Sequence, residues 1–390
     1  MSYLDYSVRR IPTGFQRLAY INLPIIVILI TIATIGFMML FSVAGGSTEP
    51  WAKVQMTRFC IGFAMMLIIA FIPIWFWRNI SGLAFFISLF LLLLVEFFGV
   101  SGMGAVRWLD LGFMRLQPSE LVKVTVIMFL ASYYDWLPRN KVSNVVWIIV
   151  PLLIILLPVF LVVRQPDLGT ALLILLGGLS IMFIAGVSWF YFAISGLGIF
   201  TFLFSIFYFR GTEFQFLKDY QYRRIDTFLD PASDPLGAGY HITQSKIALG
   251  SGGFSGRGFM QGTQSRLNFL PEKHTDFIFT TLSEEFGFIG GVVLLLLYLS
   301  IVIYGFVIAL KSRNQFGRLI GMGVMNVFFL NYFVNIAMVM GLLPVVGMPL
   351  PLVSYGGTSL ITYMFGIGLV LCVFVNRDVN LRPGSAEIIS

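Results

Sequence analysis

Long apolar runs separated by short polar connections dominate the chain, and they determine its fold class. Each run is about as long as an α-helix needs to cross a ~30 Å hydrocarbon core. The least apolar of them contains Glu120 and Lys123. The pattern predicts an all-α, polytopic integral membrane protein with about ten transmembrane helices. These are expected at 23–43, 60–77, 82–100, 117–134, 144–163, 168–187, 189–209, 287–310, 319–343 and 359–375.

The polar connections between the runs give the orientation. With the N-terminus inside, the short connections hold eleven Lys and Arg residues on the cytoplasmic side and five outside. Because cytoplasmic connections of membrane proteins are enriched in these residues, we expect both termini to be cytoplasmic. The segment 210–276 then becomes a large extracytoplasmic loop between helices 7 and 8. We expect a single membrane domain over 1–390 that includes this loop.

Composition supports this interpretation. Hydrophobic residues make up 58% of the 390 residues and charged residues only 11%, outside the usual range of soluble domains. The formal net charge of +7 also orients the chain in the membrane, so it does not by itself indicate an anionic partner. We expect no nucleic-acid partner. The first run is expected to remain as a membrane anchor.

Two charged residues lie within one candidate span. Glu120 and Lys123 are three residues apart, so they share one helix face and can neutralise each other. Two interpretations have about equal weight. The pair either lines a polar cavity that faces a substrate, or forms a structural ion pair that holds helices together.

The end of the long loop carries the clearest candidate for chemistry. The apolar stretch that follows this end predicts a helix, with Thr275 as its N-cap and Asp276 in its first turn. A helix N-terminus favours the ionised carboxylate, which could then accept a proton from a substrate hydroxyl. The alternative is that Asp276 only complements the helix dipole. Glu284 would lie on the same stripe, where it holds a cation, pairs with a basic residue or solvates the helix end.

The long loop also combines basic residues with glycines. The glycine-rich run 250–258 allows close backbone approach, and the neighbouring cations suit a phosphate group. A flexible, solvated loop is the alternative. The cations concerned are Arg223, Arg224, Lys246, Arg257, Arg266 and Lys273.

Several separate motifs resemble the SEDS family (shape, elongation, division and sporulation), the polytopic glycosyltransferases of bacterial peptidoglycan synthesis. The motifs follow the family order along the chain: QPSELVK at 117–123, QPDLGT at 165–170, FLPEKHTDFIF at 269–279 and PLPLVSYGG at 349–357. Two further stretches, GMGAVRWL at 102–109 and GTQSRL at 262–267, resemble the elongation-type branch more than the division-type branch.

The resemblance implies an activity and the residues that carry it. Asp276 would be the catalytic aspartate, and Glu120 and Lys123 a polar pair near the active cavity. The substrate would be lipid II, which is polymerised into β-1,4-linked glycan strands with release of undecaprenyl pyrophosphate, for cell-wall elongation and rod shape. The protein would lie in the bacterial cytoplasmic (inner) membrane. We also expect substrate binding by Arg107, Arg224, Lys246 and Lys273.

Partners and cofactors follow from the same resemblance. A class B penicillin-binding protein, which is a transpeptidase, and other elongation-complex membrane proteins are the expected partners. A divalent cation, Mg²⁺ or Mn²⁺, is one source of positive charge for the leaving pyrophosphate, and the loop cations are the other. The competing functions are a lipid II flippase that uses Glu120 and Lys123 for alternating access, and a non-catalytic scaffold for the penicillin-binding protein.

Overall fold

The chain folds almost entirely into helices, which confirms the predicted all-α, polytopic fold. The computed structural model describes residues 22–102, 105–110, 112, 115–212, 215, 222, 226–227, 229–230, 238–263 and 272–379. Its main helices are α1 (Leu23–Val43), α2 (Ala52–Phe71), α3 (Ile74–Phe98), α4 (Pro118–Trp136), α5 (Val145–Arg164), α6 (Leu168–Ala185), α7 (Trp189–Tyr208), α9 (Ala238–Ser251), α11 (Ile278–Lys311), α12 (Gln315–Val339) and α13 (Gly357–Val375).

A long helix stands at each place where the sequence predicts a span. Among the described residues, eight of these helices are long and apolar enough to cross a membrane: α1, α2, α3, α5, α6, α11, α12 and α13. The remaining two are α4 and α7. In α4 the predicted charges Glu120 and Lys123 are present, and Asp135 is a third. Each helix satisfies its own backbone hydrogen bonds, which is the condition for crossing lipid.

The boundaries predicted for the second and third spans are wrong. The helix expected at 60–77 is α2, which begins eight residues earlier at Ala52, and the chain turns before Pro73, so that α3 starts at Ile74. A proline interrupts a helix because it lacks an N–H donor and clashes with the preceding turn. Arg78, expected in the connection, therefore lies inside α3, and its Nε is 2.8 Å from Oδ2 of Asp135 on α4.

Polar side chains mark several helix starts. The side-chain oxygens of Asn22, Asn144, Asp167 and Asn314 accept hydrogen bonds from the first-turn amides of α1, α5, α6 and α12. Such caps satisfy amides that have no partner within the helix. These residues stop the apolar runs at defined positions.

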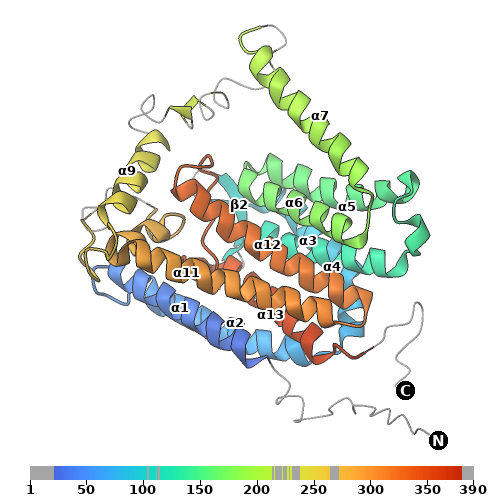
Figure 1. Ribbon diagram of the computed structural model, residues 1–390, viewed down its shortest axis with the longest axis horizontal. Coiled ribbons are helices and arrows are strands. Elements are labelled where there is room, and N and C mark those ends of the chain that lie inside the picture. Colours follow the sequence, from blue (N-terminus) through green and yellow to red (C-terminus); the bar gives the residue numbers. More distant parts are fainter. Residues whose placement is uncertain are drawn as a thin grey trace, which may run out of the picture.

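The interior of the bundle is built around α11, α12 and α13. Figure 1 shows α11 and α12 running side by side, with α1 and α2 along one flank and α3 to α6 along the other. The candidate spans of α12 and α13 are 72% and 78% buried, against 28% for α2 and α3. Helices α12 and α13 are therefore surrounded mainly by protein, while outer helices such as α2 and α3 present apolar side chains to lipid.

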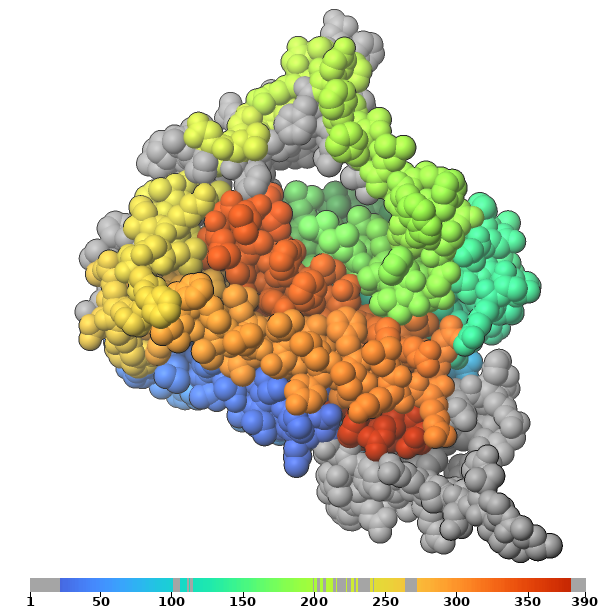
Figure 2. Space-filling view, in the orientation of Figure 1, coloured from blue at the N-terminus to red at the C-terminus, as the bar shows by residue number. Residues whose placement is uncertain are grey.

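Helix α7 stands apart from this bundle. In the space-filling view it rises clear of α12, with a hollow between them (Figure 2). Its large side chains are exposed, including Trp189, Leu197, Phe200 and Phe204. An apolar helix that covers no other helix requires lipid or another apolar surface around it.

Three short antiparallel strands, which the sequence did not predict, connect α3 to α4. They are β1 (Val100–Gly102), β2 (Ala105–Asp110) and β3 (Arg115–Leu116), in the order β1-β2-β3. Val100 pairs with Trp108, and Leu109 with Leu116. This small sheet carries Arg107 at the end of the bundle where α4 begins.

The glycine-rich run of the long loop is docked onto α11 rather than held free. Gly287 has φ 65° and ψ −161°, a break inside the helix. At this break, helix amides donate hydrogen bonds to carbonyl oxygens of the loop. Phe288 N donates to Gly253 O at 3.0 Å, and Ile289 N donates to Phe254 O at 3.2 Å. In return the amides of Arg257 and Gly258 donate to carbonyls of α11.

The backbone of this run is therefore committed to α11. A Cβ on Gly256 would lie 2.1 Å from the carbonyl oxygen of Glu285, so a glycine is required for this approach. The structure accounts for these glycines by helix docking, and neither the phosphate-cradle nor the flexible-loop interpretation is needed for them.

Candidate functional site

Asp276 lies in a turn, residues 272–277, that directly precedes α11. The helix begins at Ile278 with Phe277 at its N-cap, so the predicted position of Asp276 in the first helical turn is wrong. Thr275 does not cap the helix either. Its Oγ1 donates to Oε2 of Glu272 at 2.8 Å, within the turn.

The surroundings of Asp276 make it a candidate general base near neutral pH. Burial, which is the largest cause, acts together with the negative charges of Glu272 and Asp167 and against the positive charge of Arg107, and the net effect raises the pKa of Asp276 to about 7. The predicted stabilisation of the carboxylate by a helix N-terminus is thus outweighed by burial and by two acidic neighbours. A carboxyl with a pKa near the working pH combines a useful ionised fraction with appreciable basicity.

The positive neighbour, Arg107, is fixed by the connection between α5 and α6. Its Nε donates to the carbonyl oxygen of Gln165 at 3.1 Å, and its Nη2 donates to that of Pro166. Its Nη1 lies 3.9 Å from Oδ1 of Asp167. The guanidinium is about three-quarters buried, which holds its charge in a defined position relative to Asp276.

Asp167 is a site residue that the sequence prediction missed. Its Oδ1 accepts from the amide of Thr170 and caps α6, while its Oδ2 accepts from Nε2 of Gln117 at 3.2 Å. It therefore joins β2, α4 and α6 at one end of the bundle. The signal was present, since Asp167 belongs to the QPDLGT motif and Gln117 opens the QPSELVK motif.

The segment between α12 and α13 lies against the carboxylate. A Cβ on Gly347 would be 3.4 Å from Oδ2 of Asp276, and Gly347 has φ 71°, a conformation that favours glycine. From Met348 to Ser354 most of this irregular segment is buried, whereas Leu342 and Pro344 at its start are exposed.

His274 fixes the other side of the turn. Its ring stacks on Trp51 with centroids 4.6 Å apart and lies 6.1 Å from Tyr355. Burial lowers the pKa of His274, and the repulsion from Lys273 adds to this against the attraction of Glu272. The neutral imidazole therefore serves as a flat packing surface between α2 and the segment before α13.

Glu120 and Lys123 form a buried ion pair on α4. Nζ of Lys123 donates to Oε1 of Glu120 at 2.8 Å, and both side chains are nearly inaccessible. The ammonium also lies 5.4 Å from the ring centroid of Tyr363 on α13. Oε2 of Glu120 has no hydrogen-bond partner.

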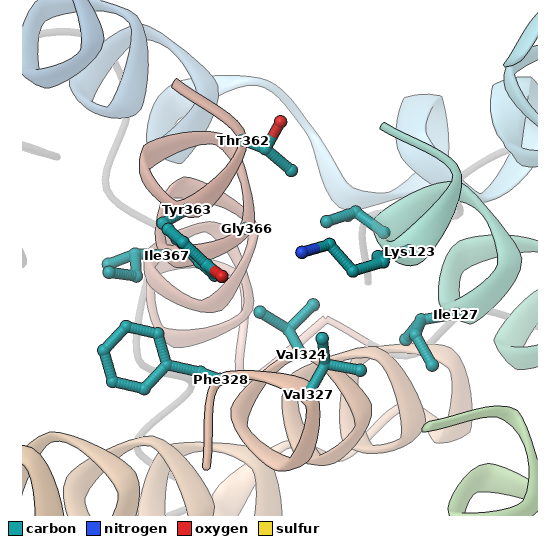
Figure 3. A pocket seen from close by; sticks show the side chains of 10 residues that line it. Lys123, Ile127, Val324, Val327, Phe328, Thr362, Tyr363, Gly366 and Ile367 are labelled. Carbon is teal, nitrogen blue, oxygen red and sulfur yellow. The ribbon is translucent and has the colours of Figure 1, made fainter. Parts of the chain in front are cut away.

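A small cavity lies beside Lys123, between α4, α12 and α13 (Figure 3). Apart from Lys123, Thr362 and Tyr363, its lining is apolar, with Ile127 and Val324 among its walls. This environment favours the structural ion-pair interpretation over a polar cavity large enough for a substrate head group.

The other predicted binding residues are distributed differently. Lys273 is buried in the Asp276 turn, and burial lowers its pKa. Lys246 is exposed on α9, and its ammonium packs on Gly341 in the turn after α12. Arg224 lies outside the described residues. The structure thus brings Arg107 and Lys273 close to Asp276 in the fold, and places Lys246 on a separate helix.

The acidic residues of α11 anchor the long loop and helix α1. Oε1 of Glu284 accepts from the amide of Thr263 at 2.7 Å and from its hydroxyl at 3.0 Å, while Glu285 accepts from Ser42 of α1. Within the part of the chain that the structure describes, no three His, Cys, Asp or Glu side chains gather as a cation site.

The fold and the site define a polytopic membrane protein. At one end of its helix bundle lies an aspartate whose pKa is about 7, next to an arginine. The chain belongs to the FtsW/RodA/SpoVE family of cell cycle proteins, which matches residues 22–378. The motif-based resemblance is thereby confirmed, and with its apolar helices the chain is a multi-pass protein of the bacterial inner membrane.

Named relatives share most of their length with the chain. The peptidoglycan glycosyltransferase MrdB of Escherichia coli K12 is 46% identical over 287 residues, covering 73% of this chain and 75% of that protein. MrdB of Helicobacter pylori 26695 is 37% identical over 308 residues, 74% of each protein. A probable peptidoglycan glycosyltransferase FtsW of a Geobacter species is 41% identical over 281 residues, 72% of this chain and 74% of that one.

Solved structures are also similar. A chain from a study of polymerization and crosslinking by a peptidoglycan synthase complex gives a TM-score of 0.77 at 30% identity, covering 92% of this chain and 98% of that one. The rod shape determining protein RodA of Thermus thermophilus gives 0.69 at 27% identity, covering 92% and 97%.

Proposed function

We propose that this chain is a peptidoglycan glycosyltransferase that polymerises lipid II into β-1,4-linked glycan strands for cell-wall elongation and rod shape. The observation that carries the proposal is Asp276, whose pKa burial raises to about 7 beside the fixed guanidinium of Arg107. The names of the relatives that match most of the chain support the same activity.

In the mechanism, Asp276 acts as the general base. Its carboxylate takes the proton from the 4-hydroxyl of the acceptor N-acetylglucosamine while that oxygen attacks the anomeric carbon of the donor N-acetylmuramic acid. The bond from this carbon to undecaprenyl pyrophosphate breaks, and the pyrophosphate leaves with the electron pair. Inversion converts the α-linked donor into a β-1,4 bond. General base assistance is typically worth ~10² to 10⁴ in rate.

The leaving pyrophosphate needs positive charge as it develops. Arg107 and Lys273 supply it from the protein in our proposal, and a Mg²⁺ or Mn²⁺ bound with the pyrophosphate is a second source. Turnover in excess chelator decides between them. Loss of activity that either cation restores would establish the metal, whereas full activity would leave the side chains as the source.

The partner is proposed to be a class B penicillin-binding protein, with other elongation-complex membrane proteins around it. The match to a chain from a peptidoglycan synthase complex supports such an assembly. The distribution of Lys and Arg along the chain orients the Asp276 end toward the outside, where the penicillin-binding protein would crosslink the new strand.

The experiment that tests the function is glycan synthesis from purified lipid II. The chain is assayed with its penicillin-binding partner, whose transpeptidase site is inactivated, and wild type is compared with Asp276→Asn at equal yield of folded complex. Polymer from wild type alone is the expected result. Equal polymer from both would remove Asp276 from the chemistry.

No polymer from either protein would favour the two competing functions. Lipid II translocation in vesicles would then identify a flippase, for which the buried Glu120–Lys123 pair is the relevant feature. Complex formation without translocation or synthesis would identify a scaffold for the penicillin-binding protein.

A further inference from the structure

Three consecutive backbone carbonyls of the Asp276 turn are held by donors from one part of the chain. The carbonyl oxygen of His274 accepts from the amide of Tyr355 at 2.9 Å. That of Thr275 accepts from the hydroxyl of Ser354. The carbonyl oxygen of Asp276 itself accepts from Nδ2 of Asn335 at 3.0 Å. One donor lies on α12 and the other two lie in the segment between α12 and α13, so each is between 59 and 81 residues from its acceptor in the sequence.

Asn335 ties three parts of the fold together through one amide group. It stands on α12 and is completely buried. Its Nδ2 donates to Asp276 and also to the carbonyl oxygen of Met348, in the segment that lies against the carboxylate. Since both partners are carbonyl oxygens, only the NH₂ end of the amide fits this position.

Ser354 extends the same arrangement. It is 3% exposed, and its hydroxyl accepts from the amide of Leu350 at 2.7 Å while donating to Thr275. Its own carbonyl oxygen accepts from Nε2 of Gln55 on α2 at 2.9 Å. Hydrogen bonds from Leu350 and Gln55 therefore fix Ser354 in the position from which its hydroxyl donates to the turn.

We propose that Asn335 and Ser354 are positioning residues for the glycosyl transfer, which hold the backbone of the turn so that the Asp276 carboxylate faces the acceptor hydroxyl. This inference rests on the proposed function. Fixing consecutive carbonyls removes the freedom of the turn to rotate about its own backbone, which would move the carboxylate. A displacement of about 1 Å at a reacting group can cost ~10² in rate.

The chain offers a matched control one helical turn away. Asn331 is also on α12 and nearly fully buried, and its Nδ2 donates to the carbonyl oxygen of Pro349 at 3.1 Å and to the hydroxyl of Tyr363. It has the same chemistry and burial as Asn335, yet among the described residues its hydrogen bonds go to Pro349 and Tyr363 and not to the Asp276 turn. Leucine has the same branching and the same number of side-chain heavy atoms as asparagine, with a larger volume and no N–H donor, so Asn335→Leu and Asn331→Leu remove equivalent donors with equivalent packing changes.

The test measures kcat, KM and thermal stability in the lipid II polymerisation assay for Asn335→Leu, Asn331→Leu, Ser354→Ala and Asp276→Asn. We expect Asn335→Leu and Ser354→Ala to lower kcat by about 10- to 100-fold with KM within about twofold of wild type. Asn331→Leu should keep kcat within about threefold at a similar loss of melting temperature.

A pH profile adds a readout that simple destabilisation would not move. The charged groups that act on the Asp276 carboxyl are Glu272 in the turn, Arg107 from β2 and Asp167 from the α5–α6 connection, and the titratable residues Lys273 and His274 adjoin it in the turn. None of them is altered in Asn335→Leu. A loosened turn admits water to the carboxyl, so the acid limb of the kcat/KM profile should move to lower pH in Asn335→Leu and Ser354→Ala and stay in place in Asn331→Leu.

Two outcomes would overturn the inference. Equal losses of kcat in the Asn335 and Asn331 variants, in step with their melting temperatures, would show a packing role alone. Wild-type kcat in both Asn335→Leu and Ser354→Ala would show that the turn needs no such support. If Asp276→Asn remains active, the assignment of the base fails instead, and the positioning role fails with it.

Discussion

The near-neutral pKa of Asp276 can be shifted by a single isosteric change at Glu272. This residue is the largest charged contribution to the raised pKa, and it lies in the same turn. Glu272→Gln removes its negative charge, and the glutamine Oε1 can still accept from Oγ1 of Thr275, as Oε2 of Glu272 does. The perturbation is therefore electrostatic, and the fold of the turn should survive it.

The size of the effect follows from Coulomb's law. One charge at about 8 Å in an effective dielectric of about 20 is worth roughly 2 kcal/mol, or about 1.5 pKa units. Salt screening at this partly accessible end of the bundle reduces it to about one unit. Removing a negative neighbour makes the ionised carboxyl more favourable, so the pKa of Asp276 falls.

The assay is the pH dependence of kcat/KM, which reports the pKa of the free enzyme's base. Wild-type activity should rise with pH through about 7. In Glu272→Gln this rise should occur about one pH unit lower, and the ionised base, now weaker, should give a similar or slightly lower plateau. Asp167→Asn should also shift the acid limb of the kcat/KM profile to lower pH, by less than Glu272→Gln does. A limb that stays in place, or moves to higher pH, would refute the role of Asp276 or the electrostatic account of its pKa.

Three further predictions concern stability. The folded-state pKa of Asp276, about 7, lies above the ordinary 3.8, so its ionisation opposes folding increasingly as pH rises from about 4 to 7. Asp276→Asn should therefore raise the unfolding free energy by roughly 4 kcal/mol at pH 8 and little near pH 4, measured by thermal unfolding in detergent. Glu120→Gln or Lys123→Met alone should each cost roughly 3–5 kcal/mol by leaving a buried charge unpaired, whereas the double variant should recover most of that loss in the same measurement. Gly256→Ala forces a Cβ against the backbone at φ +82° and should release the loop to limited proteolysis, while Gly250→Ala, with open space around it, should leave the cleavage pattern unchanged.

The sequence alone determined the helices and the main catalytic candidate. Whether a run crosses the membrane depends on the hydropathy and length of that run, because every helix closes its own backbone hydrogen bonds. The spans at 23–43, 144–163 and 168–187 were therefore placed within two residues of α1, α5 and α6. Where two apolar runs meet at Pro73, hydropathy could not show which side of the turn each residue joins, and the boundary was wrong.

Only the tertiary structure decided the chemistry around Asp276. Its pKa depends on burial and on charges from Glu272, Arg107 and Asp167, which come from three separate parts of the chain. The local pattern suggested an ionised carboxylate at a helix start, and the fold instead placed the residue in a buried turn. The support from Asn335 and Ser354 was likewise invisible, because polar residues in apolar runs acquire their partners only through packing.

The difference has one physical origin. Backbone hydrogen bonding and membrane insertion are properties of single segments, so they can be derived from neighbouring residues. Electrostatic energy and side-chain hydrogen bonding are sums over every group that packs nearby, and many of these groups are distant in sequence, as Asn335 is from Asp276 at a separation of 59 residues. The sequence therefore determined that this chain crosses the membrane and pointed to Asp276 as the candidate base, and the packing of α11, α12 and the loops determined the pKa of that aspartate and the contacts that hold its turn.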